Sequence, residues 1–233
     1  PLNNNLVDKI WTRKEKKIIS KFYLLPNTSI GESYISKVNK IAYKLKKNKA
    51  DFQFITASEN NAWLLNIRGS DSKYTPIPCS YLLIDKKKEI KFFCDLKKIP
   101  NSFKTKYKKI KFIDINYIST ILTSIIKKNI MIDKNTCSIY YEEIILKNNR
   151  ILNCQDPIYG LKAIKAKKEI ENIKKAHIYD GAALTKYLFW IKNNFLKSNI
   201  TEISAEKKLF DYRKKNKNFK FLSFPTISGT GPN

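Results

Sequence analysis

Segments with strand-type and helix-type patterning alternate along much of the chain, and this alternation constrains the fold more than any other feature of the sequence. From Tyr34 to Asn48 the apolar residues recur at helical spacing, and lysines occupy the other face. "FQFIT" follows as a strand, and Ser58 is placed to cap a short helix through "ENNAWLL". The further expected segments are a hairpin of "CSYLLID" and "EIKFFCD" around "KKK", a helix from Leu96 to Tyr107, a strand "IKFID" and a helix through "YISTILTSIIKK". The pattern predicts a compact α/β domain over residues 32–150, with helices covering its sheet.

A second unit is predicted after "KNNRILNCQDPIYGLKAIK", whose Asn, Asp and Pro residues are typical of a linker between domains. A long helix from about Lys167 to Phe195 carries an apolar stripe. Thr201 is expected to cap the next helix, with Glu202 in its first turn. An expected strand, "FLSFPTIS", comes after these helices, so residues 151–233 have the pattern of an α+β domain whose sheet is incomplete. Residues 1–31 are irregular apart from the apolar "VDKIW" and are interpreted as the end of a preceding domain and a linker.

The formal net charge of +26 is carried almost entirely by lysine, because the chain has only the arginines Arg13, Arg68, Arg150 and Arg213. A charge of this size can indicate binding to nucleic acid or to an anionic membrane surface. However, Lys, Asn and Ile share A/T-rich codons, and recognition of bases favours the bidentate fork of arginine. The composition therefore argues against sequence-specific nucleic-acid binding and leaves weak, salt-sensitive attraction to polyanions.

Several other classes of protein are disfavoured by the sequence. No apolar run approaches the roughly 20 residues of a membrane-spanning helix, so we expect a soluble protein. No stretch at the start of the printed sequence reads as a signal peptide. The four cysteines form no C-x-x-C pair and are expected to be reduced, with a Cys79–Cys94 disulfide the less favoured alternative. His177 is the only histidine, so no multi-histidine metal site can form within the chain. We interpret it as a hydrogen-bonded structural residue.

The stretch "NIRGSD" is the strongest candidate for a binding site. It contains Asn66, Arg68, Ser70 and Asp71 and connects a hydrophobic helix to a hydrophobic strand, where binding groups are often carried on a rigid scaffold. The guanidinium of Arg68 could bind a carboxylate or a peptide carbonyl. The alternative is an internal salt bridge between Arg68 and Asp71 that orders the loop, and the residues alone do not decide between the two.

The chain ends in "SFPTISGTGPN", which raises the question of a phosphate-binding turn. A Walker loop requires a lysine after its second glycine, and a dinucleotide fingerprint requires a third glycine; neither is present in the sequence. We therefore favour a turn that joins two strands of an incomplete sheet.

Four stretches, in this order along the chain, resemble the large, three-domain Xaa-Pro aminopeptidases (aminopeptidase P) of the creatinase/pita-bread metallopeptidase family. They are "AWLLNIRGSDSKYTPIPCSYLLI", "KKEIENIKKAHIYDGAALTKYLFWI", "ITEISAEKKLFDYRKK" and "LSFPTISGTGPN". The resemblance implies that residues 1–31 end the first domain and its linker, that residues 32–150 form a creatinase-like α/β second domain, and that residues 151–233 begin the α+β pita-bread catalytic domain. It also implies a chain that stops before the metal ligands.

The resemblance further implies a function. Members of the family are cytoplasmic, homodimeric metallopeptidases that release an N-terminal residue when proline is second, using two divalent ions, typically manganese. Their two Asp, one His and two Glu ligands follow the "SGTGPN" turn, so the resemblance implies no catalytic residue and no metal ligand in this chain. The residues that match the family's "NIRGSD" loop, Asn66, Arg68, Ser70 and Asp71, are expected to bind substrate, with Arg68 as the main contact. Two alternatives remain open: a catalytically inactive binding or dimerisation module, and a basic protein that binds nucleic acid nonspecifically.

Overall fold

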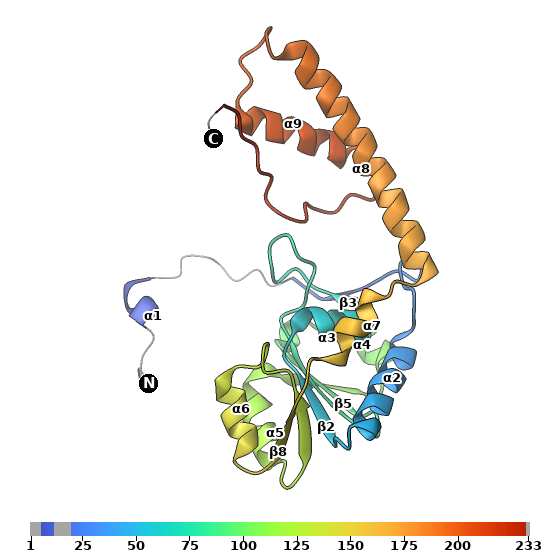
Figure 1. Ribbon diagram of the computed structural model, residues 1–233, viewed down its shortest axis with the longest axis vertical. Helices are drawn as coiled ribbons and strands as arrows, with labels where there is room; N and C mark the ends of the chain where they lie inside the picture. The colour runs from blue at the N-terminus through green and yellow to red at the C-terminus, as the bar shows by residue number, and fades with distance from the viewer. Residues whose placement is uncertain (1–5, 12–19, 232–233) are drawn as a thin grey trace.

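The computed structural model describes residues 6–11 and 20–231 and is built around one mixed β-sheet (Figure 1). The six strands lie in the order β6-β5-β4-β2-β7-β8. Strand β4 is antiparallel to β2 and β5, whereas β5–β6, β2–β7 and β7–β8 are parallel pairs. Their bounds are β2 (Phe52–Ile55), β4 (Tyr81–Asp85), β5 (Ile90–Cys94), β6 (Ile110–Asp114), β7 (Asn129–Ile132) and β8 (Arg150–Asn153). The predicted α/β class and the β4–β5 hairpin are confirmed.

Helices cover both faces of the sheet. Neighbouring residues of one strand enter different cores, as Phe92 and Phe93 of β5 do, because successive side chains of a strand point to opposite faces. One core contains side chains of α2 (Tyr34–Lys47), α3 (Ser58–Leu65), α4 (Asn101–Lys106) and α7 (Pro157–Ala163). The other contains side chains of α5 (Ile118–Ser124) and α6 (Ile139–Leu146). The domain is therefore a three-layer α/β/α sandwich.

The three helices with the clearest sequence signals are confirmed. Helix α2 begins after Ser33, whose hydroxyl accepts a hydrogen bond from the Ser36 N–H at 3.2 Å. Helix α8 (Lys167–Asn194) extends away from the sheet domain (Figure 1). Helix α9 (Glu202–Lys214) packs against α8. Thr201 caps α9 as predicted, because its hydroxyl accepts from the Ser204 N–H at 3.2 Å.

Two local predictions are wrong. Ser58 is the first residue of α3 rather than its N-cap, which is Ala57. The Ser58 hydroxyl instead donates to the carbonyl of Ser80 at 3.1 Å and accepts from the Ser80 N–H at 3.2 Å, so it fastens α3 to the segment before β4. The helix expected from Leu96 to Tyr107 is divided into a 3₁₀ turn (Leu96–Lys98) and α4, because Ile99 precedes a proline and is held in an extended conformation.

The expected linker between domains is also wrong. The helix expected through "YISTILTSIIKK" is α5, which ends at Ser124. The chain then forms β7, α6 and β8, which the sequence pattern did not predict. Strand β8 pairs with β7, and Ile158 of α7 is fully buried in the sheet domain's core. The sheet domain therefore continues past the expected boundary at 150 to include α7.

The structure near both ends of the chain also differs from what the sequence pattern predicts. Helix α1 (Leu6–Ile10) contains the first four residues of the apolar "VDKIW". Strand β1 (Tyr23–Leu24) pairs with β3 (Ile67–Arg68). Phe22 is 1% exposed, so residues next to β1 are packed onto the sheet domain instead of forming a free linker. The expected strand "FLSFPTIS" does not form, since the structure describes residues 221–230 without helix or strand. Among the described residues, no helix is long and apolar enough to cross a membrane.

Candidate functional site at the Asn66–Asp71 loop

The loop that carries the predicted site residues is anchored at its start. Helix α3 ends at Leu65, and Asn66 adopts the left-handed conformation, with φ 55° and ψ 34°, which asparagine tolerates better than most residues. Ile67 and Arg68 then pair with Leu24 and Tyr23 as the two-stranded β1–β3 sheet. The N-terminal segment therefore fixes the direction in which the chain leaves Asn66.

Asn66 is held by a buried lysine that the sequence analysis did not identify. Lys37 of α2 is 3% exposed, and its ammonium donates to Asn66 Oδ1 at 2.7 Å and to the carbonyl of Trp63 at 2.8 Å. It also lies 4.1 Å from the centroid of the Trp63 ring. Burial lowers the pKa of Lys37 to about 8. The Asn66 amide donates in turn to the Glu32 carbonyl at 2.9 Å, so this predicted site residue is engaged within the protein.

Arg68 is also partly engaged, but not with the predicted partner. Its Nη1 donates to the carbonyls of Ala62 at 3.0 Å and Ile67 at 2.9 Å. Burial lowers the pKa of the Arg68 guanidinium, and the negative charge of Glu169 acts in the opposite direction. Within residues 6–11 and 20–231, no carboxylate lies at salt-bridge distance from the guanidinium. The alternative of an Arg68–Asp71 salt bridge is therefore wrong.

Asp71 closes the far side of the loop. Its carboxylate forms a salt bridge with Lys98 and accepts from the Cys79 N–H at 2.7 Å. Gly69 lies so close to the returning chain that an added Cβ would be 2.8 Å from Pro78 Cα, which explains the absence of a side chain there. Ser70, between them, is exposed. The four predicted residues lie on one loop. The side chains of Asn66 and Asp71 have partners within the protein, and Arg68 and Ser70 remain the stronger candidates for contact with a ligand.

The described residues do not fit a two-metal centre. They contain no group of three His, Cys, Asp or Glu side chains that could hold a metal ion. His177 lies exposed on α8, and its Nδ1 is 2.9 Å from the carbonyl of Ile173 in the same helix. The four cysteines are free thiols, as expected, and the less favoured Cys79–Cys94 disulfide does not form.

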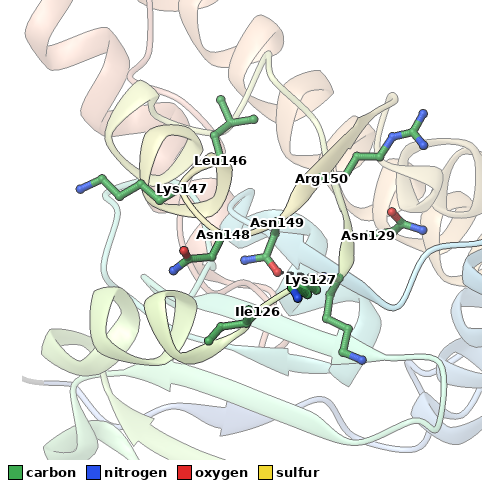
Figure 2. Close-up of a pocket in the computed structure, with 9 residues that line it drawn as sticks. Ile126, Lys127, Asn129, Leu146, Lys147, Asn148, Asn149 and Arg150 are labelled. Atoms are coloured by element: carbon green, nitrogen blue, oxygen red, sulfur yellow. Dashed lines mark hydrogen bonds between the residues drawn. The ribbon is translucent and has the colours of Figure 1, made fainter.

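A shallow depression that the sequence analysis did not predict lies at the amino-terminal ends of β7 and β8 (Figure 2). Its volume is about 590 Å³, and its lining includes Lys127, Lys128, Lys147 and Arg150. The sequence contained a signal for this depression, because Lys127 and Lys128 come directly before β7 and Lys147 comes shortly before β8. The depression is far from the Asn66–Asp71 loop in sequence, and it belongs to a different edge of the sheet domain.

The chain is similar in sequence to a known domain family and to several characterised or probable peptidases. Residues 13–169 match the family described as Creatinase/Prolidase N-terminal domain. The whole chain aligns with a probable Xaa-Pro aminopeptidase P of Laccaria bicolor at 32% identity and covers 37% of that protein. It aligns equally, at 32% identity over the whole chain and 39% of the relative, with the Xaa-Pro aminopeptidase ApepP of Drosophila melanogaster. The chain therefore spans well under half the length of these curated relatives.

A solved structure agrees with these relatives. The X-prolyl aminopeptidase of Caenorhabditis elegans, described as a cytosolic enzyme with a di-nuclear active site, superposes on 98% of this chain with a TM-score of 0.87 and 26% identity. The matched part is 38% of that enzyme. The Xaa-Pro dipeptidase of Bacillus anthracis shares the fold over 78% of this chain and 49% of its own, with a TM-score of 0.56 and 15% identity.

Proposed function

We propose that this chain, which belongs to the creatinase/prolidase N-terminal domain family, is the amino-terminal part of an Xaa-Pro aminopeptidase. The supporting observation is that similarity to Xaa-Pro aminopeptidases continues over the whole chain. This similarity therefore includes α8 and α9, whereas the family match at residues 13–169 ends in the first turn of α8.

The proposed reaction is release of the first residue of a peptide whose second residue is proline. The bond before proline is a tertiary amide without an N–H, so an enzyme that cleaves it cannot rely on a hydrogen bond from that group. Two divalent metal ions, which we propose to be manganese, would polarise the carbonyl and supply a hydroxide near neutral pH. The ligands for these ions would come from the part of the polypeptide that lies outside this chain.

The role we assign to this chain is to present the Asn66–Asp71 loop as part of the wall of the substrate site. The loop suits that role because Lys37, the Asp71–Lys98 salt bridge and the β1–β3 pairing hold it in place. Arg68 would contact the carboxylate or a carbonyl of the peptide, with Ser70 beside it. Asn66 and Asp71 would act indirectly, by fixing the loop.

We further propose a cytoplasmic, homodimeric protein. The proposed location is supported by the matched enzyme of Caenorhabditis elegans, which is described as cytosolic, and the proposed homodimer follows from the family resemblance alone. The subunit arrangement can be checked by light scattering on the full-length protein.

The experiment that tests the proposed function uses the full-length protein and a pair of peptides that differ only in proline or alanine at the second position. We expect release of the first residue from the proline peptide, loss of that release with a chelator, and its recovery with manganese. Mass spectrometry of the products identifies the cleaved bond. Preferential cleavage of the alanine peptide, or cleavage at an internal bond, would overturn the proposal.

A further inference from the structure

The sheet topology gathers the starts of most strands at one edge. Residue pairing places the first residues of β6, β5, β2, β7 and β8 in one row, together with the end of β4. The loops before these strands are joined by main-chain hydrogen bonds, such as Lys86 N–H to Asp51 O at 3.1 Å and Arg150 N–H to Lys128 O at 2.9 Å. Segments that are far apart in sequence therefore form one continuous surface.

This surface, which we call the basic edge, is densely cationic. All of its cations are exposed: Lys46, Lys47, Lys49, Lys86, Lys87, Lys88, Lys108, Lys109, Lys127, Lys128, Lys147 and Arg150. The same loops carry the carboxylates of Asp51, Asp85 and Glu89. Asp85 is occupied by the N–H groups of Lys87 and Glu89, both at 2.8 Å. Three carboxylates are too few to neutralise these cations, so the edge carries a large net positive charge.

The ion pairs among the described residues show the same excess of positive charge at the basic edge. Lys86 pairs with Asp51 at 2.7 Å, and no other cation of the basic edge is at salt-bridge distance from a described carboxylate. On α9, in contrast, Glu202, Glu206 and Asp211 alternate with the basic residues, so the charges there are mixed. A codon bias toward lysine accounts for the number of cations but not for the shortage of acidic residues at one edge.

Two exposed apolar side chains lie among these cations. Ile126 is 57% exposed and Leu146 is 52% exposed, and both line the depression at the starts of β7 and β8. Figure 2 shows Lys147 and Arg150 extending away from the depression on different sides instead of converging into it. A small anion would need converging donors, whereas an extended anionic surface can contact cations that spread outward.

We propose that the basic edge docks peripherally on a membrane surface of anionic phospholipids. Lysines near such a surface each add electrostatic attraction, and exposed Ile126 and Leu146 can enter the boundary between headgroups and acyl chains. Nucleic acid fits less well, because the loops of the edge contain one arginine, and their aromatic residue, Tyr107, is buried and offers no face on which a base could stack. The proposal concerns a surface remote from the Asn66–Asp71 loop and does not depend on the proposed peptidase activity.

The test measures sedimentation of the full-length protein with vesicles of phosphatidylcholine, with and without phosphatidylserine, at physiological ionic strength. A variant with Lys127, Lys128, Lys147 and Arg150 all replaced by glutamine is expected to bind the phosphatidylserine vesicles at least about tenfold more weakly. The matched control replaces Lys214, Lys215, Lys217 and Lys220, which are also exposed, by glutamine and removes the same charge. We expect the control to bind like the wild type. Equal weakening by both variants would show attraction by net charge alone and overturn the proposal.

A second variant separates lipid from other polyanions. Ile126→Ser combined with Leu146→Ser is expected to weaken binding to phosphatidylserine vesicles severalfold while leaving retention on heparin unchanged, because only a bilayer takes up apolar side chains. Circular dichroism confirms that each variant is folded. Unchanged vesicle binding by this variant, or tighter binding of the wild type to RNA than to vesicles, would contradict a lipid partner.

Discussion

Replacement of Asp156 by alanine is expected to lower the free energy of unfolding of the sheet domain by about 3–5 kcal/mol. Asp156 is 4% exposed and caps α7. Its carboxylate accepts from Gln53 Nε2 at 2.9 Å, from Asn60 Nδ2 at 2.7 Å and from the Ile158 N–H at 2.9 Å. It therefore connects the sheet, α3 and α7 at a single point.

The large effect follows from what the alanine would leave behind. Three buried donors would lose their acceptor, and each unsatisfied buried donor costs about 1–3 kcal/mol. Urea unfolding monitored by tryptophan fluorescence measures the change, because Trp63 packs against the same core. The control is Glu143→Ala, at an exposed position of α6, which should change stability by less than about 0.5 kcal/mol. An equally small change for Asp156→Ala would contradict the proposed linkage.

The same carboxyl group should make stability depend on pH. Burial raises the pKa of Asp156, and this effect exceeds the lowering by its hydrogen bonds to Ile158, Asn60 and Gln53. The folded state then binds this proton more tightly than the unfolded state, so the contribution of Asp156 is greatest below the unfolded pKa. It declines as the pH rises through the folded pKa, and Asp156→Asn should remove that decline from the unfolding profile.

Replacement of Arg68 by methionine in the full-length protein is expected to reduce kcat/KM for an Xaa-Pro peptide by about ten- to hundredfold, which corresponds to roughly 1.4–2.8 kcal/mol. The physical reason is that methionine cannot make the charge-assisted hydrogen bonds that the Arg68 guanidinium is proposed to make to the peptide. An Arg68→Lys variant should restore them only in part, because an ammonium lacks the planar bidentate fork. Most of the change should appear in KM, since the proposed contact is made by bound substrate as well as in the transition state.

A merely structural role for Arg68 makes a different prediction. Its bonds to the Ala62 and Ile67 carbonyls would then account for any loss, and activity would fall in parallel with thermal stability. Lys73→Met removes an exposed cation from the same segment and should leave both KM and stability near the wild-type values. If Arg68→Met lowers the melting temperature but leaves KM unchanged, Arg68 is not a substrate contact.

The parts of the fold that sequence predicted well are those set by local patterning. Helix α2, the β4–β5 hairpin and Thr201 at the start of α9 each follow from spacing or capping within a few residues. Strand β8 was missed because its four residues, "RILN", follow two asparagines and show no strand periodicity of their own. It is a strand because β7 supplies its hydrogen-bond partners, and that pairing is not visible locally.

The sequence indicated which loop to consider as a candidate site but not how its residues interact. A loop rich in polar groups pointed to Asn66, Arg68, Ser70 and Asp71, and all four lie together. Their partners Lys37 and Lys98 come from other elements, so the sequence could not show which site residues are engaged internally. Spacing did contain one clue, because Lys37 and Ile41 are four residues apart on the buried face of α2.

The most direct test of the central claim, that this chain is part of a metallopeptidase whose chemistry lies elsewhere in the polypeptide, is a parallel metal titration. Calorimetry with manganese on residues 1–233 and on the full-length protein, each followed by an Xaa-Pro peptide assay, compares the two directly. We predict two bound ions per chain and hydrolysis for the full-length protein, and neither for residues 1–233. A stoichiometric metal site with hydrolysis in residues 1–233, or a full-length protein that binds no metal and cleaves no Xaa-Pro bond, would contradict the account.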